Sequence, residues 1–126
     1  MTEKFDKGLE IRKEVLGKEY VETSINNATD FNMDLQKFVT EYCWGEIWGR
    51  EGLPKKTRSI INLAMITALN RPHELRTQIN GALNNGATTK EIEEVLLQTT
   101  IYCGVPAALD SFNIAGEVIK NRESER

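Results

Sequence analysis

The chain has 126 residues, a length that fits one domain spanning residues 1–126. Hydrophobic residues make up 40% of the sequence and charged residues 28%, which excludes wholly disordered and fibrous classes of protein. Lys and Arg number 16 and Asp and Glu 19, so the net charge is −3. This balance argues against nucleic acid as a partner, because nucleic-acid-binding proteins carry a basic surface.

The sequence predicts a protein of the cytoplasm with no membrane partner. Uncharged stretches such as residues 59–70 are shorter than the roughly 20 apolar residues that cross a bilayer. The first six residues mix both charges and lack the apolar segment of a secretory signal. Cys43 and Cys103 are far apart in the sequence, and we expect both to be reduced thiols.

The apolar residues recur every three or four positions, and no segment alternates between apolar and polar residues, which predicts an all-α fold of about six to seven helices. Gly17 is expected to end the first helix, Pro54 to lie in the first turn of another, and Thr88 with Glu91 to form a capping box. In chain order, the predicted helices cover residues 5–16, 19–26, 33–46, 55–69, 75–83, 89–103 and 108–119, followed by a frayed polar tail over 121–126.

Two of these helices carry an informative apolar pattern. In the helix from Met33, one predicted stripe contains Leu35, Phe38, Val39, Tyr42 and Cys43 and continues through Glu46. The helix after Pro54 is apolar around most of its circumference, so it should be covered on nearly every side. A chain this small can hardly do that alone, which indicates oligomerisation.

Three polar side chains lie on predicted apolar faces, where burial costs free energy unless the groups are paired or used. They are Glu46, Arg58 and Gln78, and Arg58 shares its face with Asn62. A carboxylate, a guanidinium and an amide satisfy one another if their helices meet. Two interpretations are open: a structural polar cluster, or a functional site.

The segment around Trp44 and Trp48 places two large rings at helical spacing beside a predicted Glu46–Arg50 pair. It can equally anchor a core or an interface. The single histidine, His73, and two distant cysteines do not support a metal site. The sequence contains no phosphate-binding loop, so no nucleotide cofactor is expected.

Several short motifs occur in order along the chain. They are Tyr-Cys-Trp-Gly-Glu-Ile-Trp at 42–48, Gly-Leu-Pro at 52–54, Thr-Arg-Ser at 57–59, Gly-Ala-Leu-Asn-Asn-Gly at 81–86 and Tyr-Cys-Gly-Val-Pro-Ala-Ala at 102–108. Together they resemble the carboxymuconolactone decarboxylase family, and the resemblance extends over nearly the whole chain. It implies an all-α fold shared with alkylhydroperoxidase D proteins, assembled as a ring-shaped homo-oligomer, commonly a homohexamer.

The resemblance implies a cofactor-free carboxy-lyase that converts a carboxylated lactone, 4-carboxymuconolactone, to β-ketoadipate enol-lactone and carbon dioxide in protocatechuate catabolism. Arg58 would bind a substrate carboxylate or oxyanion, Glu46 would deliver a proton or orient Arg58, and Gln78 would be a neutral hydrogen-bond donor. The expected substrate-binding residues are Trp44, Trp48, Arg50, Tyr102 and Cys103.

Gln78 departs from the family pattern, since related decarboxylases typically have His there, a better proton shuttle near neutral pH. One alternative is therefore an alkylhydroperoxidase D-like peroxidase or disulfide reductase. The Cys-x-x-Cys pair of that branch falls at Arg71 and Glu74 here, so its dithiol is missing. The other alternative is a non-catalytic ring protein that binds a small molecule.

Overall fold

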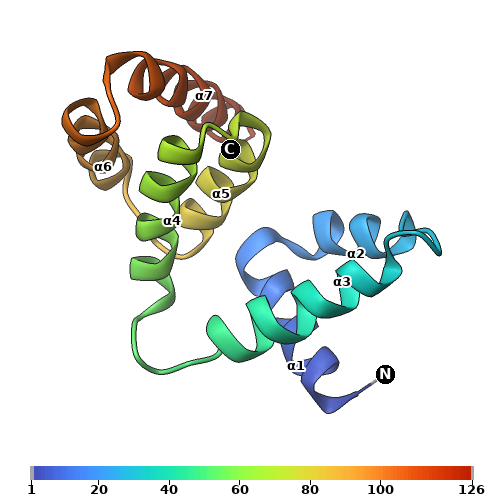
Figure 1. Cartoon of the computed structure of the whole chain (residues 1–126). Coiled ribbons are helices and arrows are strands. Elements are labelled where there is room, and N and C mark those ends of the chain that lie inside the picture. The colour runs from blue at the N-terminus through green and yellow to red at the C-terminus, as the bar shows by residue number, and fades with distance from the viewer. Residues whose placement is uncertain (1, 126) are drawn as a thin grey trace. The chain divides into compact units, whose positions relative to one another are not determined.

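A computed structural model describes residues 2–125, and every regular element in this range is helical. The chain divides into two compact units, Met1–Lys55 and Lys56–Arg126, which are described separately below (Figure 1). The predicted all-α class is confirmed; the single domain stays a prediction. The elements are α1 (Glu3–Leu16), α2 (Lys18–Asn26), α3 (Met33–Phe38), a π-helix η1 (Val39–Ile47), α4 (Lys55–Leu69), α5 (Pro72–Asn84), α6 (Thr89–Tyr102) and α7 (Val105–Ser124).

In the first unit, the backbones of α1 and η1 touch at two glycines. A Cβ atom on Gly8 would collide with the carbonyl oxygen of Thr40, and one on Gly45 would lie 3.2 Å from the carbonyl oxygen of Lys4. Neither obstacle is a flexible side chain that moves aside. Glycine at both positions is therefore what lets the two helices approach so closely.

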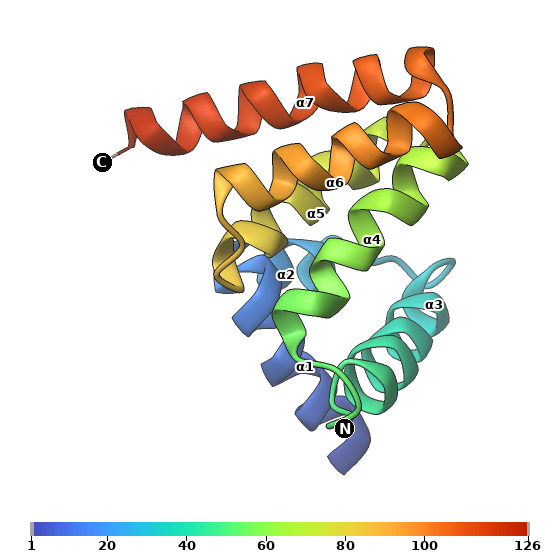
Figure 2. The same cartoon turned by 90° about the vertical axis from the view of Figure 1, so that its left-hand side faces the viewer.

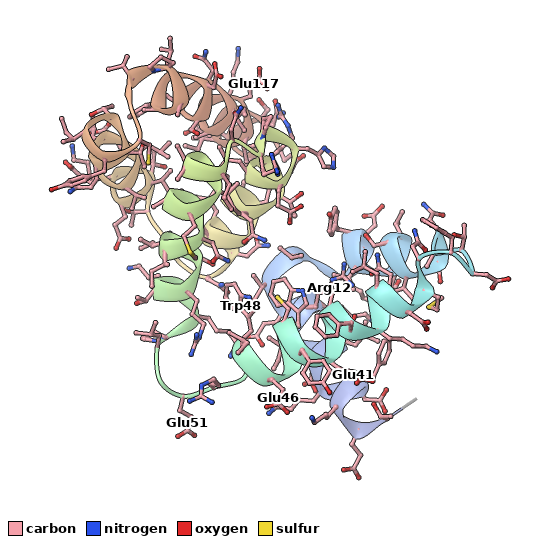
Figure 3. The ribbon with its side chains drawn as sticks, in the orientation of Figure 1. Arg12, Glu41, Glu46, Trp48, Glu51 and Glu117 are labelled. Carbon is pink, nitrogen blue, oxygen red and sulfur yellow. The ribbon has the colours of Figure 1, made fainter. Side chains whose placement is uncertain are left out.

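A buried arginine on α1 donates hydrogen bonds across the same interface. Nη1 of Arg12 donates to Oε1 of Gln36 at 2.9 Å and to Oγ1 of Thr40 at 3.4 Å. Figure 3 shows Arg12 inside the first unit rather than on its surface. Because a buried guanidinium is costly without acceptors, these contacts fix α3 and the start of η1 against α1.

The second unit has an apolar core to which all four of its helices contribute. Its fully buried side chains include Leu63 of α4, Leu75 and Ile79 of α5, and Ile92 and Leu96 of α6, and α7 adds Ala115 and Val118. Figure 2 shows α6 and α7 running side by side. Within this core the hydroxyl groups of Thr67 and Ser111 lie 2.9 Å apart, so two buried polar groups satisfy each other.

The predicted capping box at the start of α6 is confirmed. The Glu91 N–H donates to Oγ1 of Thr88 at 3.0 Å, and the Thr88 N–H donates to Oε1 of Glu91 at 2.9 Å. Nζ of Lys56 lies 3.0 Å from the other carboxylate oxygen. The Thr88 backbone N–H and then the Lys56 ammonium hold the pKa of the Glu91 carboxyl below its usual range.

The predicted frayed tail is wrong for the residues that the structure describes. Helix α7 continues to Ser124, while the last residue of the predicted tail, residue 126, lies outside the described range. Arg122 explains the ordered end, since its Nη1 donates to Oδ1 of Asn80 at 3.3 Å and to Oδ1 of Asn84 at 3.1 Å on α5. A last turn that is hydrogen-bonded to another helix does not fray.

The predicted buried stripe from Leu35 to Glu46 is also wrong. Leu35 and Phe38 are 60% and 61% exposed, Glu46 is exposed, and the buried residues of this segment are Thr40, Trp44, Gly45 and Trp48. Leu35 and Phe38 belong to α3, and their side of this helix is exposed. From Val39 the turns are wider than those of an α-helix, and the Trp48 N–H donates to the Cys43 carbonyl five residues earlier at 3.0 Å, so an α-helical period no longer follows the buried face.

The apolar helix α4 is incompletely covered by its own chain, in line with its sequence. Ser59, Leu63 and Thr67 are buried, whereas Ile61, Met65 and Leu69 are exposed along one side. Across residues 2–125, no helix is both long enough and apolar enough to cross a bilayer.

Replacing Gly8 by Ala should destabilise the protein by about 1–3 kcal/mol or more, because the new methyl group overlaps the Thr40 carbonyl oxygen. Gly116→Ala on α7 is the matched control, since a Cβ there meets nothing within 4 Å. The control should be neutral or stabilising, as alanine favours a helix. Urea unfolding followed by circular dichroism measures both, and equal stabilities of the two variants would contradict the close contact.

Replacing Glu91 by Gln should lower the melting temperature at pH 7, because the ion pair with Lys56 is lost. The folded-state pKa of Glu91 is depressed, so its contribution is present above the unfolded pKa and is lost as the pH falls through the folded pKa. The two proteins should therefore converge in stability only when the pH falls below the folded-state pKa of Glu91, which is lower than its usual value. Glu10→Gln, on the exposed side of α1, serves as the control. A pH-independent difference would contradict this assignment.

Candidate functional site

The predicted residues of the first unit lie on and after η1. The rings of Trp44 and Trp48 stack with centroids 4.9 Å apart and pack against Val15 in the core of this unit. Figure 3 shows Glu46 and Trp48 on opposite sides of η1. The stacked rings thus support the helix from inside, while the carboxylate of Glu46 faces outward. The substrate-binding role of the two tryptophans stays a prediction.

Glu46 forms an ion pair with a residue that the sequence did not single out. Nζ of Lys4 lies 3.1 Å from Oε1 of Glu46 and 5.0 Å from the centroid of the Tyr42 ring. The Glu46 carboxylate, as hydrogen-bond acceptor and negative charge, raises the pKa of Lys4 above its usual value. The predicted Glu46–Arg50 pair is wrong, since Arg50 forms no ion pair with any residue from 2 to 125. The chain leaves the helix before Arg50, so the α-helical i, i+4 spacing does not apply.

In the second unit, Gln78 of α5 lies against a face of the neighbouring helix α4. Gln78 on α5 is only 6% exposed, as its place among apolar residues predicts. Its Oε1 accepts a hydrogen bond from Nδ2 of Asn62 at 3.3 Å. Asn62 lies one turn after Arg58 on α4, so Arg58, Asn62 and Gln78 form one polar group, named here the α4–α5 polar cluster.

The guanidinium of Arg58 has no acceptor anywhere in residues 2–125, and its Nε is buried. The next residue differs, because the buried hydroxyl of Ser59 accepts from Nδ2 of Asn85 at 2.9 Å. Leaving a cation unpaired at a partly buried position costs free energy that a bound anion recovers. The α4–α5 polar cluster therefore has the chemistry of a carboxylate- or oxyanion-binding site.

The remaining predicted residues lie at the surface of the second unit or close to it. Tyr102 ends α6 and is 80% exposed, and Cys103 follows it, partly buried. Cys43 lies in the first unit, where it is exposed, and Cys103 lies in the second. Over the described range, no three or more His, Cys, Asp or Glu side chains gather to hold a metal ion.

The predicted catalytic set is thus divided between the units: Glu46 belongs to the first, and Arg58 and Gln78 belong to the second. Sequence reasoning placed Asn62 on the face of Arg58 but gave it no role, although the i, i+4 spacing was a sufficient signal. Nothing in the sequence pattern singled out Lys4, because its contact with Glu46 depends on how α1 packs on η1.

Comparison with known proteins assigns this helical chain to a family. The chain belongs to the carboxymuconolactone decarboxylase family, whose model matches residues 33–117.

Three relatives narrow the comparison. The chain is 42% identical to the 4-carboxymuconolactone decarboxylase of Acinetobacter baylyi over 94% of its length and 89% of the relative. It is 40% identical to the nitrosuccinic acid decarboxylase of Metarhizium robertsii over 93% of its length and 82% of the relative. An uncharacterized 15.0 kDa protein from the nqo9-nqo10 intergenic region of Paracoccus denitrificans is 36% identical, covering 69% of this chain and 66% of the relative.

Proposed function

We propose that the chain is a cofactor-free carboxy-lyase that converts 4-carboxymuconolactone to β-ketoadipate enol-lactone and carbon dioxide. The observation that carries this proposal is the 42% identity to a 4-carboxymuconolactone decarboxylase over 94% of the chain. The unpaired guanidinium of Arg58 supports it independently, because the substrate is an anion. Such a reaction belongs to protocatechuate catabolism in the cytoplasm.

The reaction needs a place for the electron pair that carbon dioxide leaves behind. When the bond between the ring carbon and the departing carboxylate breaks, its electrons enter the conjugated system and reach the lactone carbonyl oxygen. That oxygen becomes a dienolate oxyanion, and a proton is then added to carbon. Donors fixed in advance around such an oxygen are worth several kcal/mol, or about 10²–10³ in rate for each.

The α4–α5 polar cluster supplies donors of this kind. Arg58 offers a guanidinium fork to a carboxylate or to the oxyanion, and Gln78 offers an amide N–H from a buried position. Glutamine cannot exchange a proton as an acid, so we assign proton delivery to Glu46, whose carboxylate first takes up a proton from water and releases Lys4. Trp44, Trp48, Arg50, Tyr102 and Cys103 complete the proposed substrate-binding set.

A second candidate substrate comes from the relative named nitrosuccinic acid decarboxylase. Nitrosuccinic acid carries a carboxylate on the carbon that bears the nitro group, and its loss transfers the electron pair to nitro oxygens. Both reactions thus develop negative charge on oxygen beside a departing carboxylate, and both need the same donors.

We further propose that the chain assembles into a ring-shaped homo-oligomer, a hexamer. The support is apolar surface that one chain leaves uncovered on two helices of the second unit: Ile61, Met65 and Leu69 of α4, and Leu97 and Ile101 of α6. Large exposed apolar side chains at one-turn spacing are typical of interfaces between subunits.

Wild-type protein should release carbon dioxide from freshly prepared 4-carboxymuconolactone faster than the uncatalysed control. Arg58→Lys keeps the charge but removes the planar fork, and should lower kcat about 10²–10³-fold. Arg76→Ala on α5 is the matched control, because Arg76 is paired with Glu117 at the surface, and its turnover should be unchanged.

This assay can reject either the role of Arg58 or the proposed substrate. Wild-type turnover in Arg58→Lys and Arg58→Ala would remove Arg58 from the mechanism. If wild-type protein does not accelerate the reaction, 4-carboxymuconolactone is the wrong substrate, and nitrosuccinic acid is then tested in the same carbon dioxide assay.

The mass of the oligomer is measured by light scattering on the protein as it elutes from a size-exclusion column. Wild type should have the mass of several subunits, and Ile101→Glu should shift it to smaller species, because a charge replaces a side chain that is 78% exposed in the single chain. Gln98→Glu, an exposed polar position on the same helix, should leave the mass unchanged. A wild-type monomer would contradict the ring.

A further inference from the structure

The two ends of the Gln78 amide have different environments. Oε1 accepts from Asn62, whereas no group within residues 2–125 accepts a hydrogen bond from Nε2. A primary amide has one acceptor end and one donor end, and exchanging them changes almost nothing in shape. Which end faces a ligand is therefore decided by the hydrogen bond at the other end.

We infer that Asn62 is a positioning residue that orients Gln78 so that its N–H, and not its carbonyl oxygen, is presented to the anionic substrate. The inference rests on the proposed decarboxylase function and adds to it the residue that fixes the donor. Because Asn62 donates to Oε1, the lone pairs of Gln78 are engaged on the α4 side. A reversed amide would turn those lone pairs toward the developing oxyanion and repel it.

The position of Asn62 suits this task. Asn62 lies one turn after Arg58 on α4, so the residue that orients the amide and the cation that binds the anion share one rigid helix. Gln78 is held among buried apolar neighbours of α5, including Leu75 and Ile79. The helix packing thus fixes where the amide lies, and the hydrogen bond from Asn62 holds Oε1 on the α4 side.

Asn62→Asp tests the orientation of the Gln78 amide, because the substitution hardly changes the shape of the side chain at position 62. A carboxylate only accepts hydrogen bonds, so it should capture Nε2 of Gln78 and reverse the amide. We expect kcat for 4-carboxymuconolactone to fall about 10²-fold, with a smaller change in KM. Asn113→Asp, which adds the same charge at an exposed position of α7, should leave kcat unchanged.

The carboxylate introduced by Asn62→Asp also faces Arg58, so a double-mutant cycle separates that effect from the reversal of Gln78. In a Gln78→His background the imidazole donates one N–H to this carboxylate, and the negative charge favours the imidazolium, which keeps a second N–H for the substrate. Asn62→Asp should then lower kcat less than about tenfold. An equal loss in both backgrounds would show that Asn62 does not act through Gln78.

A spectroscopic measurement tests the orientation without any substrate. The side-chain N–H signals of Gln78 in ¹H–¹⁵N spectra, assigned by their absence from Gln78→Glu, should move downfield in Asn62→Asp as the amide donates to the carboxylate. Unmoved signals would overturn the inference. If Asn62→Asp does not fold, Asn62→Ala replaces it; the signals should then shift as the contact to Oε1 is lost, and unmoved signals again overturn the inference.

The spectra and the kinetic assays together distinguish a failure of the proposed function from a failure of the positioning role of Asn62. Shifted signals in a protein that does not decarboxylate 4-carboxymuconolactone would retain the role of Asn62 and reject the substrate. Turnover by the wild type, together with unmoved signals and undiminished kcat in Asn62→Asp, would retain the function and reject the positioning role.

Discussion

The contact between the backbones of α1 and η1 is the constraint on which the first unit depends. Gly8 lies directly against the Thr40 carbonyl, and Gly45 lies against α1 from the other helix. This approach leaves no room for side chains at the crossing, so the large rings of Trp44 and Trp48 fill the core beside it. It also brings Lys4 to Glu46. A carboxylate assigned to proton transfer is thus placed by two residues that have no side chain.

In the second unit, buried polar side chains form hydrogen bonds with one another in pairs. Thr67 is matched with Ser111, and Ser59 with Asn85, both at 2.9 Å. Arg58 is one exception, with a buried Nε and no acceptor among the described residues, and Nε2 of the buried Gln78 is another. Where neighbouring buried hydroxyl groups are paired, an unsatisfied cation indicates a ligand more strongly than it would on a loosely packed surface.

The sequence predicted those features that depend on local chemistry. The all-α class, the capping box of Thr88 and Glu91 and the burial of Gln78 follow from spacing and side-chain type, and the structure confirms them. It misassigned the buried face of η1, because periodicity assumes an α-helical turn and this segment has π-helical turns. It also missed the pairing of Lys4 with Glu46, and it gave Asn62 no role toward Gln78, since both depend on which helices meet.

The wide turns of η1 have a consequence for how this segment can change in evolution. Each residue added to or removed from a helix rotates everything beyond it by about 100°. One deletion between Val39 and Ile47 would convert the segment toward an ordinary helix and turn Glu46 toward the core and Trp48 toward solvent. Substitutions on its outer face leave this register intact. Residues 39–47 should therefore be variable in composition on that face but fixed in length among proteins that retain the same chemistry.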